Sequence, residues 1–299
     1  MGASHFNRVV KDPNDLVTAP RETTRGFIIQ ATEKMTRAGL VVKEALEIER
    51  KLNRAATAEE ILRDPSLTSV VLSCAGLSTK AQGHLNKRQL KDIARAAIDE
   101  IASTKGELGR QILFRFLLTA GDSLGGAMRN WTGSSAQAQV TQLLKDRLTK
   151  AGVRPVVESS DTGKTQSIQW EKRLIAFDRT PKFIGKNIDV ILLMSQSDET
   201  PTKILVNTAA NFLAIGEIKG GIDPAGADEH WKTASKALQR VREAFAGKTC
   251  PKLFFAGVAI EIAMAKEIFE EVKNGTLDFA ANLTSEKQAS ALADWLISL

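Results

Sequence analysis

Two short apolar runs, each interrupted by ionisable residues, constrain this chain more than any other feature. Residues 187–193 read NIDVILL, and residues 214–219 read AIGEIK. Both runs have the length and composition of buried strands. Because successive side chains of a strand point to opposite faces, Glu217 and Lys219 share one face. Charged groups inside an apolar strand are costly, so we expect them to serve a function there.

The segment between these runs contains a polar stretch with a proline, residues 195–201, which predicts a turn. The two strands would then lie side by side in antiparallel order, with Asp189 and Glu217 close together and Lys219 beside them. Mg²⁺ prefers oxygen ligands, typically one or two carboxylates together with phosphate oxygens of the substrate. Asp189 and Glu217 are therefore the candidate metal ligands, and Lys219 is the candidate for polarising water or phosphate in phosphodiester cleavage. The alternative is a half-exposed edge strand with a harmless Glu–Lys pair, since short motifs also arise by chance.

Charge and cysteine usage narrow the class of protein. The 299 residues carry a formal net charge of +6, which suits a polyanionic partner such as double-stranded DNA. Cys74 and Cys250 lie far apart without metal-binding spacing, which disfavours a zinc site and fits a reducing compartment. We find neither an apolar run long enough to span a bilayer nor a leader pattern, so we expect a cytoplasmic protein with no membrane partner.

The order of periodic segments predicts an α+β fold, a mixed sheet flanked by helices with a helical region before it. The segments with helical spacing before residue 152 are 24–54, 58–62, 67–72, 86–104, 108–120 and 130–150. The later strand-like runs are 153–157, 167–170, 188–194, 204–206, 212–218 and 252–260, and the later helices are 227–246, 262–272 and 284–299. We therefore predict a mainly helical region at 1–151 that wraps DNA and a catalytic core at 152–299, with one continuous fold as the alternative.

Two glycine-containing segments are candidates for binding loops. Gly121–Asn130 has three glycines and ends in Arg129 and Asn130, which we expect to contact DNA from a turn between helices. The alternatives are a plain helix-to-helix turn or a dimer contact. Asp161–Thr165 ends like a phosphate-binding P-loop, but Glu158 stands where that loop needs glycine, so ATP binding is rejected.

The residues after Lys219 carry a resemblance to a known family. Residues 220–233, GGIDPAGADEHWKT, resemble the segment after the catalytic lysine in type II restriction endonucleases of the AvaI/BsoBI type. Gly121–Asn130 resembles restriction endonucleases more broadly, and Lys186 ahead of Asp189 fits as well. The resemblance implies a PD-(D/E)xK nuclease with Asp189, Glu217 and Lys219 at the catalytic positions, although Ile188 replaces the proline of that signature.

The same resemblance suggests roles for residues near the strand. His230 matches a histidine proposed as general base, and Asp223 matches an acidic residue that reads base edges. From the residues alone, a lone histidine such as His230 is more often structural, and Lys219 could serve instead. The carboxylate of Asp223 has a comparable chance of structural use, whereas Asp228 is expected to cap the following helix.

Taken with the resemblance, these residues predict an Mg²⁺-dependent restriction endonuclease that cuts a short palindrome, of the form CYCGRG by resemblance. Water would attack in line and leave 5′-phosphate ends. Two active sites on a palindrome require a homodimer, and a cognate methyltransferase would protect host DNA. Lys80 and Lys87 are further candidates for phosphate contacts. The alternatives are a non-cleaving DNA-binding module on the same fold and a structure-selective repair nuclease.

Overall fold

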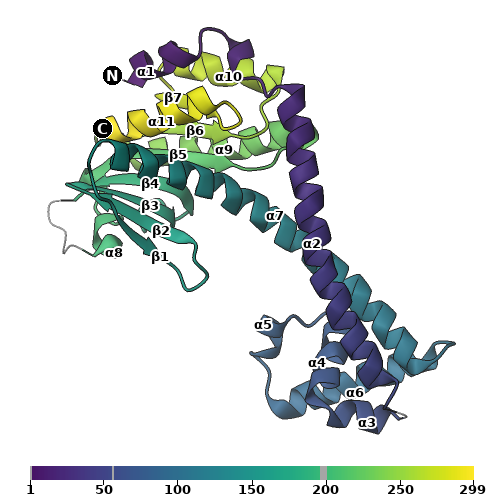
Figure 1. Cartoon of the computed structure of the whole chain (residues 1–299). Coiled ribbons are helices and arrows are strands. Elements are labelled where there is room, and N and C mark those ends of the chain that lie inside the picture. Colours follow the sequence, from purple (N-terminus) through teal and green to yellow (C-terminus); the bar gives the residue numbers. More distant parts are fainter. Residues whose placement is uncertain (1, 56, 196–200) are drawn as a thin grey trace. The chain divides into compact units, whose positions relative to one another are not determined.

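The chain folds into helices and a seven-stranded sheet, and the computed structural model describes residues 2–55, 57–195 and 201–299 (Figure 1). The residues group into two compact units, Met1–Ile28 together with Asn130–Leu299, and Ile29–Arg129. We call them the sheet unit and the helical unit. Each has its own apolar core. Two long helices, α2 (Pro20–Leu52) and α7 (Leu108–Lys150), contribute residues to both units.

The units meet after residues 28 and 129, whereas the sequence predicted a boundary between residues 151 and 152. The change from helix to strand falls near that boundary, because α7 ends at Lys150 and β1 (Val156–Ser159) follows. The end of α7 nevertheless belongs with the sheet unit. Its apolar residues Val140, Leu144 and Leu148 are buried in the core of that unit.

The helical unit is built from short helices with strong start signals. Between α2 and α7 the chain forms α3 (Ala58–Arg63), α4 (Pro65–Cys74), α5 (Thr79–Gln82) and α6 (Lys87–Ser103). Asp64 separates α3 from α4, where its carboxylate accepts hydrogen bonds from the backbone N–H groups of Ser66 and Leu67. Proline at the first position of α4 suits a helix start and not a helix interior. Asp64 and Pro65 thus separate the helices that correspond to the predicted segments 58–62 and 67–72.

The glycine-containing segment Gly121–Asn130 is not a turn, and its predicted loop is wrong. It lies inside α7, which runs without interruption over 43 residues. Glycine lowers helix propensity by only about 1 kcal/mol relative to alanine. That local cost is outweighed by packing on both sides of the segment, where Ile112 and Val140 are buried in the two separate cores.

The sheet unit contains a mixed sheet in which the strands follow one another in chain order. Its strands are β1 (Val156–Ser159), β2 (Thr165–Trp170), β3 (Arg173–Arg179), β4 (Ile188–Met194), β5 (Phe212–Lys219), β6 (Lys252–Gly257) and β7 (Phe279–Asn282). The first five pair antiparallel, whereas β5–β6 and β6–β7 pair parallel. The parallel pairs are connected through α9 (Ala227–Ala244) and α10 (Ile262–Lys273). The α+β prediction is confirmed.

Two consecutive phenylalanines in β6 show how helices cover both faces of this sheet. Because adjacent side chains of a strand point to opposite faces, Phe254 and Phe255 meet different helices. Phe255 makes an edge-on contact with Trp231 of α9, with ring centroids 5.1 Å apart. Phe254 makes an edge-on contact with Trp295 of α11 (Glu286–Ser298), at 5.8 Å. Trp231 is therefore a core residue, as its 2% exposure also shows.

Some strand predictions differ from the structure. The predicted strand at 204–206 is part of a short helix, α8 (Thr202–Leu205), in which Leu205 is buried. Strand β3 was not predicted, although it forms the centre of the antiparallel part, and neither was β7. Of the predicted turn at 195–201, residues 196–200 lie outside the described part of the chain.

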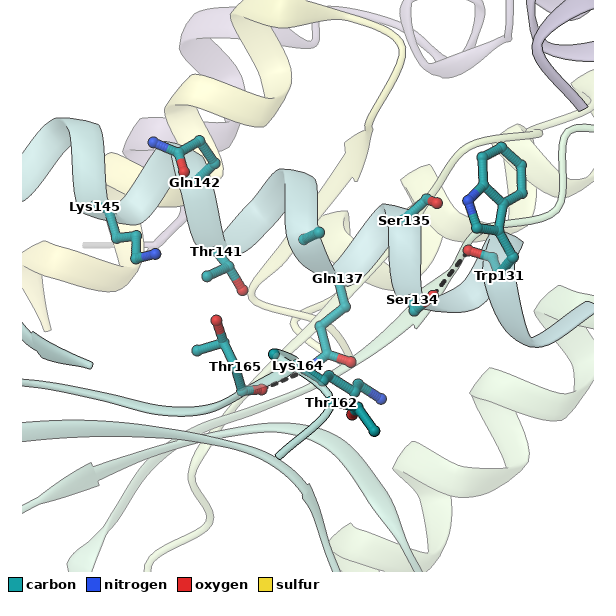
Figure 2. A pocket seen from close by; sticks show the side chains of 12 residues that line it. Trp131, Ser134, Ser135, Gln137, Thr141, Gln142, Lys145, Thr162, Lys164 and Thr165 are labelled. Carbon is teal, nitrogen blue, oxygen red and sulfur yellow. Dashed lines mark hydrogen bonds between the residues drawn. The ribbon is translucent and has the colours of Figure 1, made fainter. Parts of the chain in front are cut away.

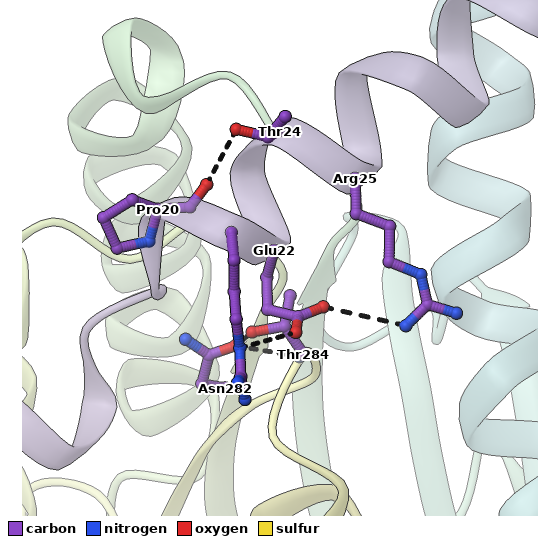
Figure 3. A network of polar contacts seen from close by, with 7 residues as sticks. Pro20, Glu22, Thr24, Arg25, Asn282 and Thr284 are labelled. Atoms are coloured by element: carbon purple, nitrogen blue, oxygen red, sulfur yellow. Dashed lines mark hydrogen bonds and ion pairs between the residues drawn. The ribbon is translucent and has the colours of Figure 1, made fainter.

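The N-terminal segment completes the sheet unit beside β7. This segment comprises α1 (Gly2–Val9), the 3-10 turn η1 (Pro13–Leu16) and the start of α2. Asn282 donates from Nδ2 to the carbonyl of Leu16 at 2.8 Å, and Thr18 donates from Oγ1 to the carbonyl of Val258 at 2.8 Å. Figure 3 shows the polar groups nearby, including the hydrogen bond from Thr284 to Asn282. The segment that leads into α2 is thereby attached to the end of the sheet.

Candidate active site

The two ionisable strands of the sequence lie next to each other at the centre of the sheet. β4 and β5 pair antiparallel, with Val190 opposite Gly216. Continuing this register places Asp189 opposite Glu217, on the same face, because directly opposed residues of an antiparallel pair project together. The predicted pairing of the two strands is confirmed.

Lys219 bridges the two carboxylates. Its Nζ lies 2.6 Å from Oε2 of Glu217 and 3.1 Å from Oδ2 of Asp189. The same Oδ2 also accepts a hydrogen bond from the backbone N–H of Ile218, at 2.9 Å. Asp189 is therefore held by both the main chain and a side chain of β5. The predicted convergence of two carboxylates and a lysine is confirmed as geometry.

The charges of this site are unusually costly to bury. Glu217 is only 3% exposed. Burial, followed by the nearby charge of Asp189, raises the pKa of Glu217 to about 7, although Lys219 opposes the shift. Burial lowers the pKa of Lys219, but the two carboxylates more than offset this and raise it above its ordinary value. A harmless surface pair would not carry such shifts, because exposed ion pairs are screened by water.

The chain leaves the site through two glycines that neighbouring atoms approach closely. A Cβ on Gly220 would lie 2.1 Å from the carbonyl oxygen of Thr132 in α7. A Cβ on Gly221 would lie 2.7 Å from Nε2 of His230. The backbone of α7 therefore requires glycine at position 220, whereas a side chain at position 221 would only have to displace the exposed imidazole of His230.

His230 is located near the triad but does not bind it. It is exposed in the first turn of α9, and its imidazole lies against Gly221. Among the residues that the structure describes, no hydrogen bond joins it to the three triad side chains. Lys186 is exposed in the connection that leads into β4, three residues before Asp189.

Of the two aspartates after β5, Asp223 caps a turn and Asp228 does not cap the helix that the sequence predicted it to cap. Asp223 is the N-cap of the 3-10 turn η3 (Pro224–Gly226), where its Oδ1 accepts from the N–H of Ala225 at 3.0 Å. Asp228 is not a cap, because Gly226 occupies the cap position of α9. Asp228 pairs instead with Lys232, one turn further along the helix. Asp223 is exposed, so its carboxylate remains accessible for further hydrogen bonds.

The remaining candidates for DNA contacts lie away from the triad in the sequence and are all exposed. Lys80 is in α5 and Lys87 is the first residue of α6, both within the helical unit. Arg129 and Asn130 follow each other in α7 at the point where the helical unit gives way to the sheet unit. None of these four residues belongs to the triad.

One arginine on the strand next to β4 was not among the predicted site residues. Arg179 ends β3 and pairs with Ile188, the residue before Asp189. Its Nε is buried and has no hydrogen-bond partner in the part of the chain that the structure describes. The apolar run from Leu174 to Phe177 would have indicated this strand and, at its end, the arginine.

The donor set of the triad fits a hard divalent cation. Within the described ranges no group of three or more His, Cys, Asp or Glu side chains could enclose a metal by itself. Mg²⁺ does not require such a group, because it is usually held by one or two carboxylates, phosphate oxygens and water. Asp189 and Glu217 supply two carboxylates, and the raised pKa of Glu217 shows that the site favours a compensating positive charge.

A mixed sheet with two carboxylates and a lysine on adjacent central strands defines the class of restriction-endonuclease-like α+β proteins. Comparison with known proteins identifies the group within it. The family model described as restriction endonuclease BsobI matches residues 6–299. The chain is 33% identical over 310 residues to the type II restriction enzyme AvaI of Nostoc sp., covering 97% of this chain and 98% of that protein. It is also 33% identical over 318 residues to the type II restriction enzyme BsoBI of Geobacillus stearothermophilus, covering 98% of each. This chain belongs to the restriction endonuclease BsobI family.

Proposed function

We propose that this protein is a type II restriction endonuclease that hydrolyses double-stranded DNA with Mg²⁺ and leaves 5′-phosphate ends. The observation that carries the proposal is the bridge of Lys219 between Glu217 and Asp189. Family membership supports the same reaction class, since the relatives AvaI and BsoBI are type II restriction enzymes. No helix of the described residues is long and apolar enough to cross a membrane. We expect the enzyme to act in the cytoplasm.

Each triad residue has a distinct task in this proposal. Asp189 and Glu217 would hold the cation through their carboxylates. When bound, Mg²⁺ supplies a Lewis acid that activates water and stabilises negative charge on phosphoryl oxygens. Lys219, already positioned by both carboxylates, would donate a hydrogen bond to the attacking water or to a non-bridging phosphate oxygen. Because its pKa is raised, Lys219 acts as a donor and not as a base.

We assign the proton acceptor to His230. Imidazole titrates near neutrality, which suits a general base at physiological pH. Its position against Gly221 keeps it close to the strand end that carries Lys219. A substrate-bound water between the triad and the first turn of α9 would be within reach of both.

Recognition is assigned to the exposed segment between β5 and α9. Asp223 uses one carboxylate oxygen for the turn in which it lies, and a carboxylate can accept further hydrogen bonds, for example from cytosine N4 in the major groove. This chemistry suits a palindrome that contains cytosine, such as CYCGRG. Lys186, Arg129, Asn130, Lys80 and Lys87 would contact the DNA backbone. A methyltransferase of the same specificity would protect the host.

The enzyme is proposed to act as a homodimer. A palindrome presents two scissile phosphates related by a two-fold axis, so cutting both strands requires two triads. The helical unit exposes apolar side chains that a monomer has little reason to present, namely Met35, Leu40 and Leu46 of α2 and Phe114 and Leu118 of α7. Burial of these side chains against a second copy would remove them from water. Sedimentation of wild type and of Leu118→Glu tests this, with a smaller fraction of dimer expected for the variant.

Digestion of sequenced phage DNA, followed by mapping of the fragment ends, tests the proposed activity. Purified protein with Mg²⁺ should give discrete fragments whose ends share one palindrome. Sequence-specific retardation of duplex DNA without cutting would indicate the non-cleaving module instead. Cutting confined to branched or nicked DNA would indicate a structure-selective repair nuclease.

A further inference from the structure

A polar cavity of about 490 Å³ lies between α7 and the turn that joins β1 to β2 (Figure 2). The side chains from α7 that line it recur every three or four residues, at Ser134, Ala138, Thr141 and Lys145, so they form one stripe along the helix. Thr162, Lys164 and Thr165 line the opposite wall. Neither the triad nor the proposed recognition residues take part in it.

The cavity contains a buried hydroxyl without a partner. Thr141 is only 4% exposed, and its Oγ1 has no hydrogen-bond partner among the described residues. A threonine in a helix ordinarily uses this hydroxyl on a backbone carbonyl of the preceding turn. Leaving a buried hydroxyl unpaired destabilises a protein by about 1–3 kcal/mol. Gln137, beside it and 8% exposed, makes only a long bond of 3.4 Å to the carbonyl of Thr165. Both groups therefore have hydrogen-bonding capacity for a ligand.

The charge of the cavity favours an anion. Lys145 is half-buried and has no ion-pair partner within the described ranges. Lys164 is held by the carboxylate of Asp178, 2.8 Å from its Nζ, which orients its ammonium and offsets its charge. The cavity thus offers one uncompensated cation together with a hydroxyl and an amide. This combination of a cation and neutral donors suits a phosphate group.

The position of the cavity relates it to DNA and not to a free nucleotide. In an antiparallel meander, the β1–β2 turn, the β3–β4 connection and the end of β5 lie at the same end of the sheet. The triad is at that end. Two to three strand spacings, roughly 10–15 Å along the sheet, separate β1 and β2 from β4. Glu217 shares its face with Phe255 and α9, whereas α7 pairs with α11 on the other face through Arg147 and Asp294, so the cavity and the triad lie at the same end of the sheet but on opposite faces. Trp131, at one end of the cavity, is the neighbour of Thr132, whose carbonyl lies against Gly220.

We infer that this cavity binds a backbone phosphate of the DNA substrate, a few nucleotides from the phosphate that is cut. The inference rests on the proposed DNA-cleaving function. Lys145 supplies the charge, Thr141 and Gln137 supply hydrogen bonds, and Lys164 closes the site from the β1–β2 turn. Such a contact fixes the register of the duplex on the sheet without reading its sequence.

Measurements of DNA binding test the inference. The duplex contains the cleavage site mapped from the enzyme's own digest, and Ca²⁺ replaces Mg²⁺ to prevent cutting. Lys145→Ala should weaken binding about tenfold at 0.1 M salt and reduce the slope of log K against log salt by about one. Lys150→Ala is the matched control, since it removes the same charge from the same helix but not from the cavity. It should leave affinity and slope close to the wild-type values.

Thr141→Val separates binding from folding, because it removes the unpaired hydroxyl and keeps the shape. We expect an unchanged or higher melting temperature together with about threefold to tenfold weaker binding. In a further series of duplexes, each duplex has one phosphate replaced by a neutral methylphosphonate. At one position other than the scissile phosphate, this replacement should reduce the affinity of wild type but not that of Lys145→Ala.

The inference would be overturned if Lys145→Ala and Lys150→Ala bound DNA equally well and no methylphosphonate position distinguished Lys145→Ala from wild type. Cutting of DNA by wild type would in that case leave the proposed function in place. Failure of wild type to cut or bind any duplex would overturn both. Loss of folding in Lys145→Ala would be recognised from its melting temperature, and Thr141→Val would then decide the question.

Discussion

The carbonyl oxygen of Thr132 in α7 lies where a side chain on Gly220 would have to be, only 2.1 Å from the position of a Cβ. Gly220 directly follows Lys219, so the helix is in contact with the end of the catalytic strand. The neighbouring atom is backbone and cannot rotate away, which makes this contact sensitive to the smallest substitution.

We predict that Gly220→Ala lowers the free energy of unfolding by about 2–4 kcal/mol and strongly reduces cleavage, because α7 or the end of β5 must shift. Urea unfolding and cleavage rates measure both effects. Gly133→Ala is the control, since Gly133 follows Thr132 in α7 and a Cβ there meets nothing within 4 Å. Equal stability of the two variants would contradict the contact.

Asp189→Asn should reduce the cleavage rate at least about 10³-fold, because it removes one of the two proposed carboxylate ligands. Lys219→Ala should have a comparable effect through loss of the donor. Sequence-specific binding in Ca²⁺ should remain for both. Asp99→Asn, in an exposed position of α6, serves as the control and should cut like wild type. Cleavage by either triad variant at the wild-type rate would refute the triad assignment.

His230→Gln should lower the cleavage rate about 10²-fold, because it removes the proposed proton acceptor. Gly221→Ala should have a similar but smaller effect, because its new Cβ would displace the imidazole from its place at 2.7 Å. A full rate for His230→Gln at all pH values would assign proton transfer elsewhere.

Glu217 should make the metal-free protein less stable as pH rises. Its pKa is about 7 in the folded state, against an ordinary value of 4.5 in an unfolded chain. Between these values the folded state holds the proton more tightly, so stability declines as pH rises from about 4.5 to 7. Unfolding in urea with EDTA at several pH values should show a decline on the order of 1–3 kcal/mol that Glu217→Gln lacks. Parallel curves for the two proteins would contradict the shift.

Gly121→Ala should stabilise the protein by about 0.5–1 kcal/mol, because the position is helical and a Cβ there meets nothing within 4 Å. The sequence alone suggested a turn at this position, where the same substitution would destabilise. Thermal unfolding therefore tests the continuity of α7 directly. A lower melting temperature would favour a break in the helix.

The sequence predicted the central strands of the site because their signal is local and unusual. Asp189, Glu217 and Lys219 stand inside apolar runs, and only a buried strand pair with a function explains ionisable groups there. The break at Asp64–Pro65 was equally readable, since proline and a capping aspartate act within a few residues.

Other features depend on packing that no short window of sequence contains. Gly121–Asn130 has the composition of a loop, yet the helix continues through it because distant residues on each side are buried in different cores. The cavity beside Thr141 forms where α7 packs against the β1–β2 turn, which follows α7 in the chain after strand β1. The pairing of Arg179 with Ile188 follows only from the register of β3 with β4.

The division of the chain into units has a consequence for its synthesis. The helical unit is an insertion within the sheet unit, whose first 28 residues are separated from the rest by residues 29–129. The N-terminal segment binds groups near the C-terminus, including Asn282 and Gln288. On the ribosome, the helical unit can therefore complete its core while the N-terminal segment waits for β7 and α11 to emerge. The nascent enzyme gains its finished sheet only after β7 and α11 have been made, so an incomplete chain carries the triad residues before it has the scaffold that holds them.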